Sequence, residues 1–537
     1  MSRKKEIIIL LIIVFFALVF RLIFCIPTGL SPDSVLYISL SERIAHGFLS
    51  IDSASKLHEY IQPGYPALIY IFNFFVRNPE ISGIAVSMLF SLLLIPLVYY
   101  FNKRLYGEKV GWLASFLVAF NPLLIGYSQF VLTELAFTFF FIASIYLLWI
   151  LLNNKKKTRL FLFLGILIGV SYYIRIAGLI LLGAAVCWLF VYWLSKRISF
   201  KRFLFSCLFV ILGVLIIITP YLLYLYHQKG RFVITGQQDY SLMAADELEA
   251  DELDEYKEKH QYFQSLTDDN TDYRMNHVEK NLDYRERKQS LFTIYADQFT
   301  AFIGSHLEFV FKRYLIHIIL IILAFVFYKK EKKETRKLFY PVSFIPFYLL
   351  IYLIGKPEYR YYIPLIPLIL SLTSVGAVFL IKKFKERLKV SYYIIIMLIV
   401  FSFFAYQYFD ISLYFHDFGE KYAIFGIFKG SGEISQEKKV GEYIINNFGQ
   451  GKKILVLRPR LAYYAGGDFY IIPFDDYESV MYFSKYNKID FLILDIKTDP
   501  ALRPELVSVF NVTENEDIKL IYRLENLYLY EIKYDMD

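Results

Sequence analysis

Residues 7–26 read IIILLIIVFFALVFRLIFCI, and LSPDSVLYISL follows them at residues 30–40. The first stretch has the length, about 20 apolar residues, that an α-helix needs to cross a bilayer. It follows the basic start MSRKK and has no small-residue cleavage site. We therefore predict a retained first transmembrane helix rather than a cleaved signal peptide. The second stretch predicts an amphipathic helix that lies along the membrane surface.

The composition of the whole chain is that of a polytopic membrane protein. Of its 537 residues, 57% are hydrophobic and only 20% are charged, and the mean hydropathy is +0.43. Aromatic residues make up 19% of the chain, which excludes disordered, collagen-like and nucleic-acid-binding tails. The cysteines Cys25, Cys187 and Cys207 lie in or beside apolar runs without a CxxC motif. We therefore expect neither a disulfide framework nor a thiolate metal site.

Apolar runs of spanning length recur up to residue 410, and they predict about eleven transmembrane helices. Besides residues 7–26, the runs are 81–101, 110–127, 130–152, 159–173, 175–194, 203–226, 307–328, 338–354, 362–381 and 391–409. Residues 159–194 are divided around Ser171 to Arg175, because an undivided segment would reverse the orientation of everything downstream.

Clusters of basic residues in alternate intervals set the predicted orientation. The positive-inside rule places six clusters, together with the N-terminus, in the cytoplasm. They are Arg3 to Lys5, Lys103 to Lys109, Lys155 to Arg159, Lys196 to Arg202, Lys329 to Lys337 and Lys382 to Lys389. The extracytoplasmic face then carries residues 27–80, the turn from Asn121 to Glu134, residues 227–306 and the chain after Asp410. All the candidate chemistry lies on that face.

From about Ser435 the pattern changes to that of a small water-soluble domain. Helical patterns at 435–448 and 475–487 alternate with short strand-like runs, which predicts an α/β fold. The strand-like runs are 452–457, 468–473, 489–495, 518–523 and 527–533. No GxGxxG or GxxxxGK[ST] motif supports nucleotide binding, so a stabilising or acceptor-contacting role is expected.

The predicted fold class is an α-helical polytopic membrane protein with a small C-terminal extracytoplasmic α/β domain. We expect a transmembrane domain at 1–410, with a first external loop at 27–80 and a long external loop at 227–306. A linker at 411–434 and the soluble domain at 435–537 follow.

Asp33 is the main catalytic candidate. Ser31 is expected to cap the surface helix and Pro32 to occupy its first position, which places Asp33 in the first turn. One interpretation is that the carboxylate only complements the helix dipole. The other is that an acid held at the hydrocarbon boundary acts as a base for a substrate whose other half is lipid.

The order of the external motifs resembles the polytopic C-type membrane glycosyltransferases. The similarity is greatest to the protein O-mannosyltransferases and bacterial aminoarabinose transferases, which use polyprenyl-phosphate sugars. It rests on Asp33 after the first span, on Tyr37 in the surface helix and on several further motifs. These are Gln62-Pro63-Gly64-Tyr65-Pro66, Thr133-Glu134, Tyr173-Ile174-Arg175 and EYRYYIPLIP at 358–367. The resemblance covers the chain up to about residue 410.

The resemblance implies that Asp33 is the general base for an acceptor hydroxyl and that a sugar is transferred from a polyprenyl phosphate with inversion. A hydroxyl is a poor nucleophile, and a positioned carboxylate that takes its proton contributes roughly 10²–10⁴-fold. The phosphate leaving group is already a stable anion. It therefore needs cationic stabilisation rather than a general acid.

Two arginines are candidates for that cation. Arg360 is expected at the external end of the tenth span, where its guanidinium can fork onto two phosphate oxygens; the alternative is interfacial snorkelling. Arg175 lies in the apolar sequence YYIRIAGLI, where a charge is expensive unless paired; the alternative is a structural pair with Glu134. Lys356 is a weaker third candidate. The remaining candidates for substrate binding are Glu134, Tyr37, Tyr361 and Gln62.

No obligatory metal or other cofactor is predicted. Many relatives carry an aspartate in the second external turn, whereas the turn from Asn121 to Gln129 has none. A divalent cation held by Asp33 and Glu134 is therefore unsupported. The metal-compatible side chains of the first loop, His58, Glu59 and Gln62, match no zinc spacing. The expected partners are a polyprenyl-phosphate sugar donor, an extracytoplasmic acceptor and membrane lipids, with no nucleic acid.

Three other functions stay open at this point. An oligosaccharide ligase or polymerase of the envelope would also have many spans and a large external loop, although the WWD motif of oligosaccharyltransferases is absent. A lipid-linked sugar transporter or flippase would show matching halves or paired broken helices, and neither is evident. A non-catalytic scaffold would tolerate the loss of the charge at Asp33.

Overall fold

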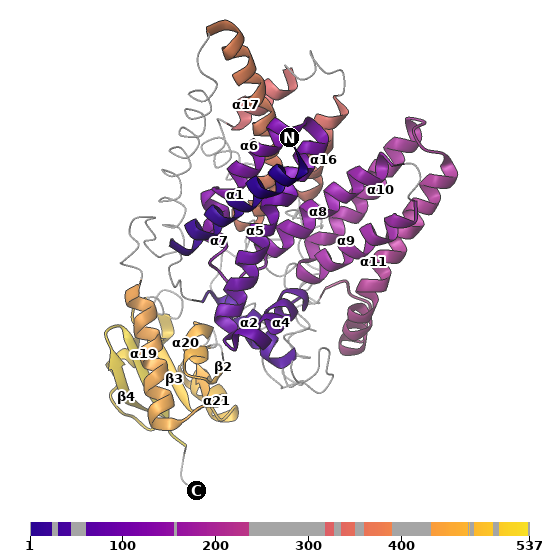
Figure 1. Ribbon diagram of the computed structural model, residues 1–537. Helices are drawn as coiled ribbons and strands as arrows, with labels where there is room; N and C mark the ends of the chain where they lie inside the picture. The colour runs from indigo at the N-terminus through magenta and orange to yellow at the C-terminus, as the bar shows by residue number, and fades with distance from the viewer. Residues whose placement is uncertain are drawn as a thin grey trace.

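The computed structural model shows a helical bundle followed by a small sheet domain (Figure 1). It describes residues 2–23, 30–44, 61–154, 158–235, 317–326, 335–349, 359–388, 431–470, 472, 477–497 and 504–534. This architecture confirms the predicted fold class of a polytopic helical membrane protein with a C-terminal α/β domain.

Within the described ranges, six helical stretches are long and apolar enough to cross a membrane. They are α1 (Arg3–Ile23), α5 (Pro79–Tyr106), α8 (Glu134–Leu152), η2 with α10 (Ile176–Leu179 and Ile180–Leu194), α11 (Phe200–Lys229) and η5 with α17 (Tyr359–Leu365 and Ile366–Leu388). Shorter helices are α2 (Pro32–Ile44), α4 (Gly64–Val76), α6 (Glu108–Ala119), α7 (Pro122–Tyr127), η1 (Thr158–Leu160), α9 (Phe161–Ile174), a helix at His317–Val326 and α16 (Arg336–Leu349). The number of about eleven spans stays a prediction, because residues 391–409 lie outside the described ranges.

The predicted division of residues 159–194 is confirmed. Helix α9 ends at Ile174, and Arg175 takes an extended backbone with φ −151° and ψ 139° before η2 and α10 begin. The chain turns back tightly here, since a Cβ on Gly178 would lie 2.4 Å from the Tyr172 backbone nitrogen. This elbow places Arg175 at a helix end rather than in the middle of a span.

The predicted span at 110–127 is wrong as a single helix. Helix α6 ends at Ala119, and Pro122 starts the separate short helix α7, because proline cannot continue the hydrogen bonding of the preceding helix. The side chain of Asn121 caps α7 by accepting a hydrogen bond of 3.1 Å from the Leu124 amide. The guanidinium of Arg21 is fully buried and donates to the Ala119 carbonyl at 2.9 Å, at the negative end of the α6 dipole.

Helices α9 and α11 pack closely through small residues. A Cβ on Gly165 would lie 2.1 Å from the Val210 carbonyl oxygen, and one on Gly213 would lie 2.2 Å from the Leu162 carbonyl oxygen. Such close backbone approach is typical of helix pairs in membranes. The two glycines therefore set the distance between these helices.

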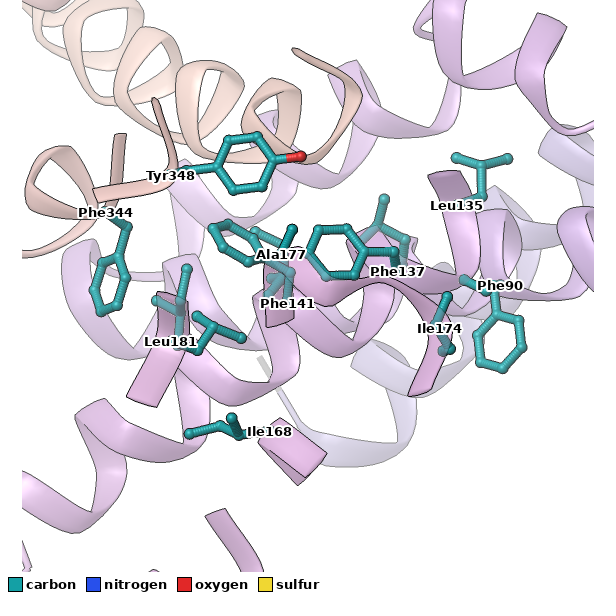
Figure 2. Packing of buried hydrophobic residues seen from close by; sticks show 14 of the residues in the cluster. Phe90, Leu135, Phe137, Phe141, Ile168, Ile174, Ala177, Leu181, Phe344 and Tyr348 are labelled. Carbon is teal, nitrogen blue, oxygen red and sulfur yellow. The ribbon is translucent and has the colours of Figure 1, made fainter. Parts of the chain in front are cut away.

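The core of the bundle surrounds the first half of α8. Figure 2 shows Phe137 and Phe141 of α8 beside Tyr348 of α16, and the ring centroids are 6.2 Å and 5.3 Å from that of Tyr348. Each of these side chains is almost completely buried, which stabilises the fold by roughly 1.5–3 kcal/mol per side chain. The cluster fixes the start of α8, where Glu134 lies.

The C-terminal domain is a five-stranded sheet with strand order β2-β1-β3-β5-β4. Its strands are β1 (Lys453–Leu455), β2 (Asp468–Tyr470), β3 (Phe491–Asp495), β4 (Ile518–Leu524) and β5 (Leu527–Ile532). Strand β1 pairs in parallel with the edge strand β2 and with the central strand β3. Strand β5 pairs antiparallel with β3 and with the other edge strand, β4. The helices are α19 (Ser431–Phe448), α20 (Pro459–Tyr464), α21 (Tyr477–Tyr486) and η6 (Pro504–Asn511). Every predicted strand is present, and α20 is an additional helix.

Candidate functional site

The surface helix α2 begins as its sequence predicts. The amide of Ser34 donates to the hydroxyl of Ser31 at 3.1 Å, which confirms Ser31 as the cap. Pro32 occupies the first helical position and Asp33 the first turn. The Asp33 side chain is 36% exposed, so a substrate can reach its carboxylate.

An aromatic contact one turn further along holds α2 against the bundle. The ring of Tyr37 packs edge-on against that of Tyr65 in α4, with centroids 5.3 Å apart. The hydroxyl of Tyr65 in turn hydrogen-bonds the hydroxyl of Ser87 in α5 at 2.8 Å. Burial raises the pKa of the Tyr37 phenol, and the negative charges of Asp33 and Glu134 raise it further. Tyr37 therefore stays protonated beside both carboxylates.

Arg360 reaches Asp33 across 327 positions of the chain. Its Nη1 lies 2.5 Å from Asp33 Oδ2, and its Nε lies 3.8 Å from Glu134 Oε1. The Arg360 side chain is 19% exposed, and the guanidinium is directed to these two carboxylates. Its position in η5, at the start of the α17 span, is the one that the sequence predicts for a phosphate-binding cation.

A second ion pair lies deeper. Arg175 Nη1 donates to Glu134 Oε1 at 2.9 Å, and the Glu134 side chain is only 2% exposed. The guanidinium carbons of Arg175 and Arg360 lie 4.7 Å and 5.6 Å from the centre of the Tyr361 ring. An aromatic face attracts cations in such positions. Tyr361 therefore supports both arginines from one side.

The structure thus brings together the catalytic candidate and most of the binding candidates. The cluster consists of Asp33, Glu134, Arg175, Arg360, Tyr361 and, at its edge, Tyr37. Gln62 has a different role in the described chain, because its amide donates to the Thr235 hydroxyl at 3.0 Å. Lys356 lies outside the described residues.

The charges of the cluster balance, since two carboxylates face two guanidinium groups. Buried ions are tolerated only when they are paired. The other carboxylate oxygen of Glu134, Oε2, is buried and accepts no hydrogen bond from the described residues. That oxygen therefore has an unused capacity to accept a hydrogen bond.

Two carboxylates, Asp33 and Glu134, lie on either side of Arg360, which raises the question of whether they hold a divalent cation. Both carboxylates already face a guanidinium, which would repel a cation placed between them. Among the described residues, no group of three or more His, Cys, Asp or Glu side chains has the arrangement of a metal site. The cluster therefore does not fit a metal, and no reaction step is assigned to one.

Sequence reasoning missed two features around this site. Arg21 was visible as the single charge within the first apolar run, but its partners on α5 and α6 were not. Helix α20 was missed because six residues are too few to show a helical period. Its side chains contact α2, which carries Asp33.

Comparison with known proteins gives a match of one segment to a family and a match of the whole chain to a fold. Residues 62–224 match the family of dolichyl-phosphate-mannose-protein mannosyltransferases, a range that includes Glu134 and Arg175 but neither Asp33 nor Arg360. No curated protein sequence matches the chain significantly.

Solved structures match over nearly the whole length. ArnT from Cupriavidus metallidurans bound to undecaprenyl phosphate has a TM-score of 0.56 at 12% identity, covering 99% of this chain and 98% of that one. The archaeal oligosaccharyltransferase AglB from Archaeoglobus fulgidus, in complex with an inhibitory peptide and a dolichol-phosphate, has a TM-score of 0.60 at 12% identity, covering 100% and 75%. An oligosaccharyltransferase from Archaeoglobus fulgidus in complex with Zn and sulfate has a TM-score of 0.58 at 12% identity, covering 91% of this chain and 68% of that one. The resemblance predicted from the sequence is thereby confirmed: the chain has the fold of the polytopic C-type membrane glycosyltransferases, and residues 62–224 are similar to the mannosyltransferase family.

Proposed function

We propose that this protein transfers a sugar from a polyprenyl-phosphate carrier to the hydroxyl group of an extracytoplasmic acceptor, with inversion at the sugar carbon. The observation that carries the proposal is the contact between Asp33 and Arg360, a base and a phosphate-binding cation from distant segments. The family match supports a membrane glycosyltransferase. Structural relatives that hold undecaprenyl phosphate or dolichol-phosphate support a lipid phosphate at this site.

The reaction requires Arg360 to leave the Asp33 carboxylate and to bind the lipid phosphate instead. In the structure its guanidinium pairs with Asp33. A lipid phosphate carries more negative charge than one carboxylate and presents several oxygens to the guanidinium. Arg360 then binds the phosphate, and Asp33 becomes free to accept a proton.

Transfer follows as a single displacement. Asp33 takes the proton of the acceptor hydroxyl, and the hydroxyl oxygen forms a bond to the anomeric carbon from the face opposite the phosphate. The bond between that carbon and the phosphate oxygen breaks, and its electron pair leaves with the polyprenyl phosphate. Arg360 stabilises the negative charge that develops on the leaving oxygen, and the charge of Arg175 adds to the positive potential at that oxygen.

Glu134 prepares the site for this step. Its Oε1 holds Arg175 and lies near the Nε of Arg360, so it fixes the orientation of both guanidinium groups. Its Oε2 accepts a hydrogen bond from a hydroxyl of the sugar or of the acceptor. Preorganised charges of this kind cost no reorganisation during the reaction.

We infer that the site faces the extracytoplasmic side, as the basic clusters predict. Helices α2 and α4 and the sheet domain lie at one end of the bundle, and the N-terminus lies toward the other (Figure 1). This arrangement fits a cytoplasmic N-terminus, with the site and the C-terminal domain on the opposite side of the membrane.

The test is a transfer assay with the purified full-length protein in proteoliposomes. Radiolabelled undecaprenyl-phosphate mannose, glucose and aminoarabinose are supplied as donors, and a mixed membrane extract is supplied as acceptor. We expect transfer from at least one donor and a loss of roughly 10²–10⁴-fold in Asp33→Asn. Glu514→Gln, which removes an ion-paired carboxylate in the soluble domain, is the control.

Equal transfer by wild type and Asp33→Asn would contradict the mechanism. Movement of the labelled lipid across the bilayer without transfer would favour the transporter alternative. Transfer from none of the donors, with an intact protein, would favour the scaffold alternative.

A further inference from the structure

Helix α20 of the soluble domain contacts α2, the helix that carries Asp33. Tyr463 and Tyr464, at the end of α20, pack against the hydrophobic core of the bundle. The hydroxyl of Tyr464 is buried without a hydrogen-bond partner among the described residues. Burial is the main cause that raises its pKa to about 12, and the nearby backbone of Leu30 partly offsets this rise. Leu30 itself is 2% exposed. The soluble domain thus contacts the chain three residues before Asp33, at the turn that starts α2.

We propose that α20 positions Asp33 for catalysis, with Tyr464 as the positioning residue. This inference rests on the proposed function and extends it, because it assigns the soluble domain a part in the reaction. Tyr464 does not touch the reacting atoms. It acts through Leu30 and the first turn of α2.

The face of α2 that meets the soluble domain also carries charge. The negative charge of Asp468, at the start of β2, raises the pKa of Arg43 in α2, although burial lowers it more. Burial raises the pKa of the Tyr463 phenol, and the charges of Glu42 in α2 and Glu80 in α5 raise it further. Charged and aromatic groups of the soluble domain therefore lie near the end of α2 as well as near its start.

The base of α20 is rigid because buried ion pairs hold it to the sheet. Arg458, the residue before α20, pairs with Glu437 of α19 at 3.3 Å and with Asp495 of β3 at 3.2 Å. Arg460 pairs with the other oxygen of Glu437 at 2.5 Å. Glu437 is 1% exposed, so this buried carboxylate joins α19 to the residues at the start of α20.

Gly441 lets α19 approach α20 closely. A Cβ on Gly441 would lie 2.5 Å from the backbone carbonyl of Tyr464. The backbones of α19 and α20 are therefore in close contact at Tyr464. Tyr464 lies between this contact with α19 and the core of the bundle, against which its ring packs.

Asp33 needs such support because α2 is short. A 13-residue helix is marginal on its own in water, so its position depends on packing against the bundle, through buried residues such as Val35 and Ile38 and the Tyr37–Tyr65 contact, and against α20. A displacement of the base by about 1 Å can lower a reaction rate on the order of 10²-fold.

The test compares three substitutions in the full-length protein, using the donor on which the wild type is active. Tyr464→Leu removes the ring and the hydroxyl, and we expect kcat to fall on the order of 10- to 100-fold while the donor KM changes less than about 3-fold. Tyr464→Phe keeps the ring and is expected to retain most of the wild-type kcat. Tyr482→Leu removes a tyrosine that is 73% exposed on α21 and should leave kcat unchanged.

Gly441→Ala provides a second route to the same effect, because its methyl group would displace the Tyr464 backbone from within the soluble domain. We expect the same fall in kcat with little change in KM. If Tyr464→Leu does not fold, the test compares the kcat of Gly441→Ala with that of Tyr464→Phe. A kcat equal to that of Tyr482→Leu in every folded variant would overturn the inference.

The Asp33→Asn background separates this inference from the proposed function. If Tyr464 acts through Asp33, then Tyr464→Leu lowers the residual rate of Asp33→Asn far less than it lowers the wild-type rate. Equal fold-losses in both backgrounds would overturn the positioning role. Wild-type activity of Asp33→Asn alone would instead contradict the proposed function.

Discussion

Asp33→Asn is expected to have opposite effects on catalysis and on binding of lipid phosphate. In the structure, the Asp33 carboxylate is paired with Arg360, the side chain that the proposed mechanism assigns to the phosphate. Phosphate binding must first break that pair. Removal of the carboxylate charge therefore makes Arg360 available, even though it abolishes the base.

The magnitude follows from the geometry of the pair. At 2.5 Å, two unit charges attract by about 1.7 kcal/mol in a medium as polar as water. The Asp33 side chain is 36% exposed and that of Arg360 is 19% exposed, so the cost of ordering both side chains offsets part of the attraction. A net value of about 1 kcal/mol corresponds to roughly a fivefold tighter Kd for the lipid phosphate. Relief of the repulsion between Asp33 and the bound phosphate acts in the same direction.

The assay is a titration of the purified protein in nanodiscs with undecaprenyl phosphate, followed by native mass spectrometry. We expect the Asp33→Asn variant to bind about fivefold more tightly than the wild type. Glu514→Gln removes an ion-paired acid elsewhere and should not change the affinity. Unchanged or weaker binding by Asp33→Asn would refute the idea that Asp33 and the phosphate compete for Arg360.

Three further outcomes follow from the same contacts. Arg360→Lys keeps the charge but loses the forked donor, so undecaprenyl phosphate should bind about tenfold more weakly in the same titration. Glu134→Gln leaves Arg175 without its buried partner and should lower the free energy of unfolding by about 3–5 kcal/mol. The double variant with Arg175→Gln should lose much less stability than the sum of the two single variants. Additive losses in denaturant unfolding would contradict the pairing. Gly165→Ala should destabilise the contact between α9 and α11 by about 1–3 kcal/mol, measured as a lower midpoint of thermal unfolding. Gly183→Ala is the matched control, because no atom lies within 4 Å of a Cβ there.

Local signals predicted most of the elements that carry the site. Ser31 and Pro32 define the start of α2, because capping depends on residues within one turn. The charge of Arg175 within an apolar run marks the elbow between α9 and α10, where η2 intervenes. The strands of the soluble domain follow from short apolar runs between polar residues.

Other features depend on packing that no local pattern encodes. Asp33 and Arg360 are 327 positions apart, and only the tertiary arrangement of α2 and η5 brings them together. The break between α6 and α7 had a local signal, Asn121-Pro122, but the apolar residues on both sides made the segment resemble one span. The contact between Tyr464 and Leu30 joins two domains, and neither residue has an unusual sequence context.

The central claim is that a lipid phosphate binds at Arg360, beside Asp33. A structure of the full-length protein with undecaprenyl phosphate tests it directly through the distances from Arg360 to the phosphate and to Asp33. We expect the Arg360 guanidinium to lie about 2.8 Å from the phosphate oxygens and to have left the Asp33 carboxylate, which would then face open space beside the phosphate. A phosphate bound at other cations, with the pair between Asp33 and Arg360 intact, would contradict the account.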